Sequence, residues 1–247
     1  FKTKEMTIFQ VFLPTFMLLY FFQVFVIRSY VQWKRTGQNP FVFSRSGNAH
    51  DYIGFVFKIM TALSVCVIIL FNLLALLLTI RITTIQIWPP PSSRSWQFWF
   101  TWISFTYFML GIPVLGILDY GTLGLSGLPR FISAGILFLI AFPIGMSAIY
   151  QLSFKQTLGL RGKFITVCVY RFTRNPQYVT HILLIAAVVL LTNSALALYI
   201  GIPYALWFIL APFSEEPWLR DQFGAAYSSY CRQTPRFIGL SKKERNL

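Results

Sequence analysis

The sequence predicts an all-α integral membrane protein with about six transmembrane helices, the last two forming a helical hairpin that is followed by an amphipathic helix. Its 247 residues are 56% hydrophobic and only 11% charged, whereas soluble domains have about a quarter charged residues. The apolar residues also form long uncharged runs, each close to the roughly 20 residues that a helix needs to cross a bilayer core. A water-soluble fold could not bury this much apolar surface, so the lipid bilayer is the first partner that we expect.

Six apolar runs define the predicted spans. They cover residues 6–27, 53–80, 98–118, 128–152, 178–192 and 196–213. Pro143 is expected to kink the fourth run. The fifth and sixth are joined by Asn193-Ser194, a link so short that the two helices must run antiparallel.

The charge of the chain is strongly basic. It carries 21 Lys and Arg residues against 7 Asp and Glu, a formal net charge of +14. Because the basic residues gather at the ends of apolar runs, where they can meet anionic head groups, we interpret them as membrane-surface charge and expect no nucleic-acid partner. The three cysteines, Cys66, Cys168 and Cys231, are far apart, and we propose neither a disulfide framework nor a metal site.

Orientation follows from the basic loops. The most basic loop, residues 154–177, and the basic C-terminal tail should both be cytoplasmic under the positive-inside rule. The basic loop 28–52 would then lie on the opposite face, because three spans separate it from loop 154–177. Either loop 28–52 lies along the membrane interface, or the number of spans is wrong by one.

The stretch before the fifth run has the features of an anion site. Asn175 is a good N-cap and Pro176 a good first helical residue, so a helix should start there. The free N–H groups of that helix end, together with Arg174, could hold a carboxylate or a phosphate. The simpler alternative is an ordinary helix start whose arginine reaches the head groups.

A second polar motif follows the sixth run. Ser214 could cap a helix whose first turn holds Glu215 and Glu216, a placement that suits the helix dipole. That helix would place four apolar or aromatic side chains on one side, namely Leu219, Phe223, Tyr227 and Tyr230. An interfacial amphipathic helix would explain the same pattern without a site. The predicted hairpin, however, returns the chain to the face it left, which would bring both motifs to one place.

Taken together, these motifs resemble the membrane methyltransferases of the isoprenylcysteine carboxyl methyltransferase and phospholipid methyltransferase superfamily. The resemblance covers roughly the last 120 residues. It rests on elements that match in order: Arg174-Asn175-Pro176-Gln177-Tyr178, an apolar hairpin, Glu215-Glu216, Leu219, Phe223-Gly224, Tyr227, Tyr230 and Pro235-Arg236. In this interpretation residues 128–247 are the S-adenosylmethionine-binding core, and residues 1–127 are transmembrane helices on the acceptor side.

The resemblance implies an S-adenosylmethionine-dependent methyltransferase whose cofactor binds from the cytoplasmic face, while a lipophilic acceptor enters from the bilayer. Arg174, Asn175 and Tyr178 would meet the methionine end of the cofactor, with Pro176 in the same motif and Tyr170 nearby. Glu215 and Glu216 would meet the amino group or the ribose, or would order Arg174. The pocket wall would consist of Leu219, Phe223, Tyr227 and Tyr230. Arg174, Glu215 and Glu216 are the candidate catalytic residues.

Two departures from the family pattern concern the loop and the helix start. Asn175 stands where the family usually has histidine, which removes a titrating side chain. Cys168-Val169 replaces a common Gly-Pro, and a frequent glycine is missing around Thr180-His181. Cofactor binding without a histidine in the motif is therefore the working hypothesis.

Several questions stay open at this level. A carboxylate or thiolate acceptor would need no base, whereas an ammonium acceptor must lose a proton, to Glu215, Glu216 or His181. Membrane sterol and steroid reductases, which use NADPH, share part of the arginine motif. A transporter or a lipid-binding protein is the third alternative, although charges gathered at one membrane face favour an interfacial site over a mid-membrane pathway. The acceptor and the oligomeric state are not predicted.

Overall fold

The computed structural model describes residues 49–82, 84–125 and 127–239, with side chains from residue 55 onward. The described chain is helical and contains no strand. Its elements are α2 (Ala49–Arg81), α3 (Trp96–Leu118), α4 (Leu128–Gln151), the short α5 (Phe154–Thr157), the 3₁₀ turn η1 (Cys168–Arg171), α6 (Pro176–Thr192) and α7 (Ala195–Gln233).

Helices α2, α3, α4 and α7 are each long and apolar enough to cross a membrane, and α6 is a shorter apolar helix of 17 residues. The predicted runs 53–80, 98–118 and 128–152 coincide with α2, α3 and α4 to within four residues. Pro143 lies inside α4, which continues across it. The first predicted span, 6–27, and most of loop 28–52 lie outside the described residues. The chain is thus a multi-pass helical membrane protein, and the count of six spans stays a prediction.

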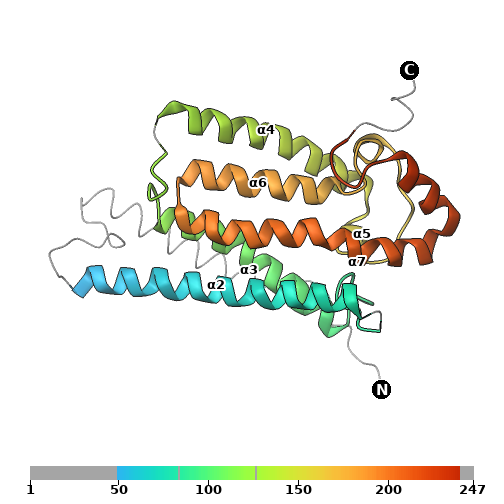
Figure 1. Ribbon diagram of the computed structural model, residues 1–247, viewed down its shortest axis with the longest axis horizontal. Coiled ribbons are helices and arrows are strands. Elements are labelled where there is room, and N and C mark those ends of the chain that lie inside the picture. The colour runs from blue at the N-terminus through green and yellow to red at the C-terminus, as the bar shows by residue number, and fades with distance from the viewer. Residues whose placement is uncertain (1–48, 83, 126, 240–247) are drawn as a thin grey trace.

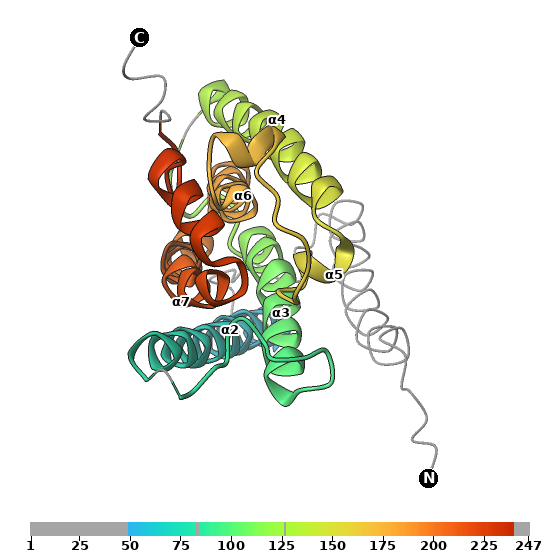
Figure 2. The same cartoon turned by 90° about the vertical axis from the view of Figure 1, so that its right-hand side faces the viewer.

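The long helices lie side by side in a bundle. Helices α6 and α7 run antiparallel through its middle, with α4 on one side and α2 and α3 on the other (Figure 1 and Figure 2). One end of the bundle, which we call the turn end, holds residues 119–125 and 127 and the Asn193-Ser194 link (Figure 1). The other, the pocket end, holds residues 84–95 and 152–175 and the C-terminal part of α7 (Figure 1).

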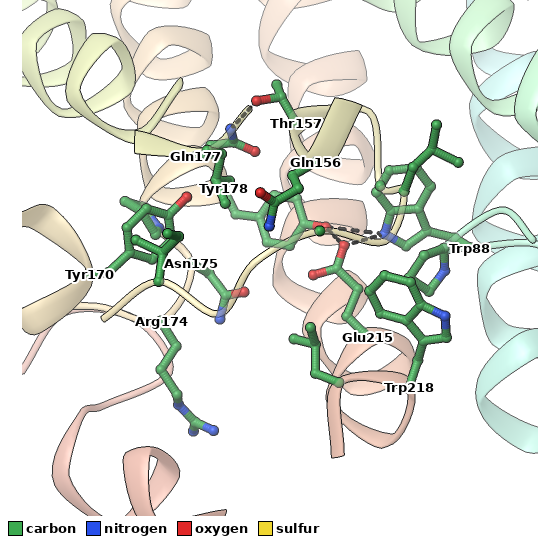
Figure 3. A pocket seen from close by; sticks show the side chains of 18 of the residues that line it. Trp88, Gln156, Thr157, Tyr170, Arg174, Asn175, Gln177, Tyr178, Glu215 and Trp218 are labelled. Atoms are coloured by element: carbon green, nitrogen blue, oxygen red, sulfur yellow. Dashed lines mark hydrogen bonds between the residues drawn. The ribbon is translucent and has the colours of Figure 1, made fainter. Parts of the chain in front are cut away.

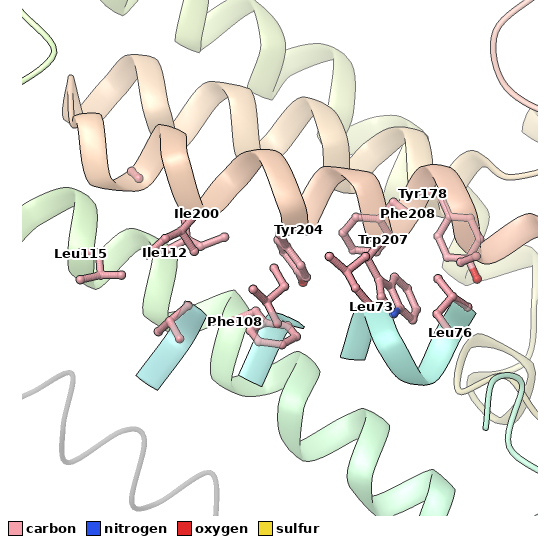
Figure 4. Close-up of a cluster of buried hydrophobic side chains, with 14 of the residues drawn as sticks. Leu73, Leu76, Phe108, Ile112, Leu115, Tyr178, Ile200, Tyr204, Trp207 and Phe208 are labelled. Carbon is pink, nitrogen blue, oxygen red and sulfur yellow. The ribbon is translucent and has the colours of Figure 1, made fainter. Parts of the chain in front are cut away.

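The core lies where α2, α3 and α7 meet. Ile69, Phe108, Tyr204 and Phe208 are almost fully buried there (Figure 4). Large apolar side chains point outward elsewhere, and Leu139 of α4 is 71% exposed. Such an apolar exterior would be costly in water but suits acyl chains, so the bundle is apolar both inside and outside.

Small residues allow α4 and α6 to approach closely. A Cβ atom added to Gly145 would lie 2.8 Å from Cγ2 of Thr180, which is closer than two carbons can approach. Close helix contact through small residues is typical of membrane helices, where packing replaces the hydrophobic effect as the driving force. This contact places the start of α6 against the pocket end of α4.

The C-terminal helix differs from the prediction. We expected a span ending at residue 213 and a new helix capped by Ser214, but α7 continues to Gln233. Ser214 is buried within this helix, and its hydroxyl donates to the carbonyl of Ala211 instead of capping. The break comes at Gly224, whose φ of 55° and ψ of −128° are non-helical, and the chain changes direction there (Figure 2). Glycine tolerates this backbone conformation because it has no Cβ.

Candidate functional site

The arginine motif starts α6 as predicted, but its side chains are used differently. Pro176 is the first residue of the helix and Asn175 its N-cap residue, yet the Asn175 side chain makes no capping hydrogen bond. Its Nδ2 donates instead to the carbonyl of Arg236, at 2.8 Å. The backbone N–H of Arg174 likewise donates to the carbonyl of Pro235, at 3.0 Å. The segment after α7 therefore holds the motif in place.

Glu216 binds arginines. Arg236 donates to both of its carboxylate oxygens, at 2.7 and 2.8 Å, and Nη1 of Arg174 lies 3.0 Å from Oε1. Arg220 is more distant, at 3.6 Å, and more exposed. The Glu216 side chain is almost fully buried and does not line the pocket described below. Of the roles left open by the sequence, its contacts fit the ordering of Arg174.

Glu215 lies in a different environment from its neighbour. Its Oε1 accepts a hydrogen bond from Nε1 of Trp88, at 2.6 Å, and another from the hydroxyl of Tyr178 (Figure 3). Trp88 comes from the connector between α2 and α3, Tyr178 from the first turns of α6, and Glu215 from α7. Three segments that are distant in sequence thus meet at one carboxyl group.

These residues line a cavity of about 370 Å³ at the pocket end, within the range of roughly 300–1,000 Å³ that is typical of small-molecule sites. Ten of the eleven predicted binding residues line it, and Glu216 is the exception. The ten are Tyr170, Arg174, Asn175, Pro176, Tyr178, Glu215, Leu219, Phe223, Tyr227 and Tyr230. The structure therefore brings the two predicted motifs together.

The cavity has both polar and apolar lining residues. Arg174, Asn175, Gln177 and Glu215 contribute the polar lining beside the start of α6, as Figure 3 shows. The apolar lining comes from the neighbouring helices: Trp102 and Phe105 of α3, Ile149 and Leu152 of α4, and Phe208 of α7. A ligand with a polar head and an apolar tail would match both kinds of lining.

Two buried donors at the cavity have no hydrogen-bond partner within the described part of the chain. They are Nε of Arg174 and Nε2 of Gln222. Because an unpaired buried donor costs about 1–3 kcal/mol, such atoms are where a ligand can add a hydrogen bond. Both are suited to carboxylate, carbonyl or hydroxyl oxygens.

Aromatic rings form a wall beside these donors. Phe164 stacks on Phe223 with ring centroids 5.1 Å apart, and Tyr227 and Tyr230 pack around Phe164. Burial raises the pKa of Tyr170, in the same wall, well above its usual range, so its hydroxyl stays neutral. Flat neutral rings of this kind provide a stacking surface for a heterocycle.

Sequence reasoning missed several residues that line the cavity. They include Trp88, Trp102, Phe105, Gln156, Gln177, Trp218 and Gln222. Trp88 precedes three consecutive prolines, which favour an extended backbone, but nothing in the sequence places this segment against Tyr178, 90 residues later. Trp218 and Gln222 could have been found, because they lie one turn before or after predicted residues on the same helix.

The fold and the cavity define a class: a multi-pass helical membrane protein with a mixed polar and apolar pocket at one end of its bundle. Residues 129–226 match the family model for phospholipid methyltransferases. This match confirms the resemblance to the membrane methyltransferase superfamily and indicates methyltransferase activity. It covers α4 to α7, up to just past Gly224, and includes all predicted binding residues except Tyr227 and Tyr230. No curated protein and no solved structure matches the chain.

Proposed function

We propose that this protein is a membrane-embedded methyltransferase that uses S-adenosylmethionine and methylates a lipophilic acceptor. The observation that carries the proposal is the convergence of ten predicted binding residues on one cavity, eight of them within the region that matches a methyltransferase family. Nothing found in the comparisons favours the reductase or the transporter.

The polar groups present fit the cofactor. The unpaired Nε of Arg174 and Nε2 of Gln222 are donors for the carboxylate or the ribose hydroxyls. Glu215 offers an acceptor for the amino group, and its orientation is fixed by Trp88 and Tyr178. The Phe164–Phe223 wall offers a stacking surface for adenine. The predicted cofactor-binding roles are thereby refined: Glu215 contacts the ligand, and Glu216 positions Arg174.

The acceptor would use the apolar lining of the cavity. Trp102 and Phe105 of α3 and Ile149 and Leu152 of α4 line the cavity with side chains suited to an acyl or isoprenoid tail. The cofactor supplies an electrophilic methyl group on a sulfonium. The chain's contribution is then to bring the acceptor into line with that methyl and to exclude water, and positioning of this kind can lower a barrier by several kcal/mol.

Calorimetry on the purified full chain in detergent tests the cofactor assignment. We expect S-adenosylmethionine to bind, and Arg174→Ala and Glu216→Ala each to weaken binding at least tenfold. Arg130→Ala is the matched control: Arg130 is an arginine of the turn end that contacts Tyr120 and Leu191, and its loss should leave the affinity unchanged.

A competition experiment separates the two enzyme alternatives. Addition of NADPH should not displace bound S-adenosylmethionine. Absence of cofactor binding, or binding that neither variant weakens, would refute the proposed function, and displacement at low NADPH concentration would favour the reductase.

A further inference from the structure

The segment that follows α7 binds the arginine motif through its backbone. The carbonyl of Pro235 accepts a hydrogen bond from the backbone N–H of Arg174, at 3.0 Å. The carbonyl of Arg236 accepts two hydrogen bonds, from Nδ2 of Asn175 at 2.8 Å and from the hydroxyl of Thr173 at 3.3 Å. These bonds hold Arg236 directly beside the residues at which α6 begins.

The side chain of Arg236 is itself held by two contacts. Its Nε and Nη2 donate to the two carboxylate oxygens of Glu216, at 2.7 and 2.8 Å. Its guanidinium also lies over the ring of Phe213, with 4.1 Å between Cζ and the ring centroid. A planar guanidinium matches a carboxylate through two parallel N–H groups, and a lysine ammonium cannot reproduce this pairing. Arg236 therefore fixes the orientation of the Glu216 carboxylate.

The Glu216 carboxylate in turn binds Arg174. Its Oε1, which accepts from Nε of Arg236, also lies 3.0 Å from Nη1 of Arg174. The Arg174 side chain is only 10% exposed and lines the cavity, whereas Glu216 and Arg236 do not line it. A guanidinium that is buried to this extent needs a fixed partner, because an unpaired charge is costly to bury. The direction of Arg174 thus depends on a carboxylate that Arg236 holds in place.

Arg220 lies near the same carboxylate but holds it less firmly. Its Nη2 is 3.6 Å from Oε2 of Glu216, and its side chain is 52% exposed. Exposed ion pairs of this length contribute little, because solvent screens them. Arg220 and Arg236 therefore carry the same charge beside one carboxylate, and of these two only Arg236 makes the bidentate bond.

We infer that Arg236 is a positioning residue of the cofactor site: through Glu216 it fixes Arg174, with its unpaired Nε, in the direction that cofactor binding requires. The inference rests on the proposed function, in which this nitrogen donates to the cofactor. Because Arg236 does not line the cavity, its removal should change cofactor binding only through Arg174.

A double-mutant cycle on the purified full chain in detergent tests this route. Equilibrium dialysis with labelled S-adenosylmethionine gives the affinities, and it also measures weak binding. Arg236→Gln alone should weaken binding roughly tenfold. In an Arg174→Ala background the same change should alter the affinity less than about twofold, since effects that act through one residue are not additive. A substitution that only loosened the fold would weaken binding in both backgrounds.

Two further variants separate geometry from charge. Arg220→Gln is the matched control, because it removes the same charge from beside Glu216 without breaking the bidentate bond, and its affinity should stay within about twofold of wild type. Arg236→Lys keeps the charge but loses the two parallel bonds, and it should weaken binding about threefold. If Arg236→Gln does not fold, Arg236→Lys takes its place in the same comparison of backgrounds.

The outcomes distinguish this role from the proposed function. An affinity of Arg236→Gln within about twofold of wild type, or an equal loss with and without Arg174, would overturn the positioning role and leave the proposed function standing. Equal losses in Arg220→Gln and Arg236→Gln would overturn it as well, because charge alone would then explain the effect. Failure of the wild type to bind the cofactor would instead refute the proposed function, and the role of Arg236 with it.

Discussion

Glu215 and Glu216 are neighbours in sequence but have different surroundings in the structure. Successive residues of an α-helix point about 100° apart, so one carboxyl group faces the cavity and the other faces the segment after α7. Glu215 meets Trp88 and Tyr178, whereas Glu216 meets Arg174 and Arg236. The sequence identified the pair as important, but the two roles are separated by the orientation of the helix.

At the residue scale, Trp88→Phe tests whether the hydrogen bond from Trp88 orients Glu215. The change keeps most of the ring but removes the Nε1 donor that lies 2.6 Å from Oε1. We expect cofactor affinity to fall roughly fivefold, the equivalent of about 1 kcal/mol for one lost hydrogen bond. Trp96→Phe is the control, since Trp96 is 63% exposed and lies outside the cavity. Calorimetry should show this loss of affinity for Trp88→Phe and none for Trp96→Phe. Equal affinities of the two variants would contradict the role of Trp88 in orienting Glu215.

At the scale of elements, the turn end is stabilised by one acid, Asp119. It follows α3 directly and caps the start of α7: Oδ2 accepts from Ser194 at 2.9 Å and from the backbone N–H of Leu196 at 3.0 Å. Thr122 donates to the same oxygen at 2.6 Å, and Lys58 of α2 lies 3.1 Å from Oδ1. Asp119 therefore connects α2, α3, the following loop and α7.

These contacts give a pH prediction. Burial raises the pKa of Asp119, but hydrogen bonds from Thr122, Leu196, Lys58 and Ser194 outweigh burial and leave the pKa below its ordinary 3.8. The unfolded chain takes up the proton first as pH falls. The stabilisation is thus complete above about pH 3.8 and is lost as the pH falls below that value.

Asp119→Asn should lower the free energy of unfolding by roughly 2 kcal/mol at neutral pH. The measurement is the apparent melting temperature in detergent from pH 7 down to pH 3, where the wild type should approach the variant. Asp221→Asn, at an exposed position of α7, should melt like the wild type throughout. A constant difference between wild type and Asp119→Asn at every pH would contradict the electrostatic explanation.

At the scale of the whole molecule, basic side chains are distributed unevenly between the two ends. The described residues of the pocket end include Arg94, Lys155, Arg161, Lys163, Arg171, Arg220, Arg232 and Arg236. Those of the turn end include Lys58, which is paired with Asp119, and Arg130. Under the positive-inside rule this asymmetry supports the expectation that the pocket end faces the cytoplasm.

Cysteine labelling tests this orientation. Cys168 is exposed at the pocket end, so in a Cys66→Ser, Cys231→Ser background a membrane-impermeant maleimide should label it only when the cytoplasmic face is outward. Tyr120→Cys, introduced at an exposed position of the turn end in a Cys168→Ser version of that background, should be labelled only in vesicles of the opposite orientation. The reverse pattern would place the cavity on the other side of the membrane.

Much of the fold could be predicted because a bilayer restricts the choices. Apolar runs of about 20 residues must be helices there, since no water satisfies the backbone, and α2, α3 and α4 follow the predicted runs closely. The helix that contains the sixth run was wrongly predicted to end at residue 213, because Ser214-Glu215-Glu216 has the composition of a helix start. Both glutamates are bonded to residues that are distant in sequence, Glu215 to Trp88 and Tyr178 and Glu216 to Arg174, and local sequence does not reveal such bonds.

The sequence by itself determined that this chain belongs in a membrane, which region resembles a methyltransferase, and that the arginine motif and the residues after the sixth run contribute side chains to one site. These features depend on composition and on spacing along single helices. Only the tertiary structure decided that Trp88 supports Glu215, that residues 235–236 hold the arginine motif, and that His181 lines the cavity. Those features depend on how helices that are distant in sequence are rotated and packed against one another, and the pattern of one helix does not fix its rotation against the next.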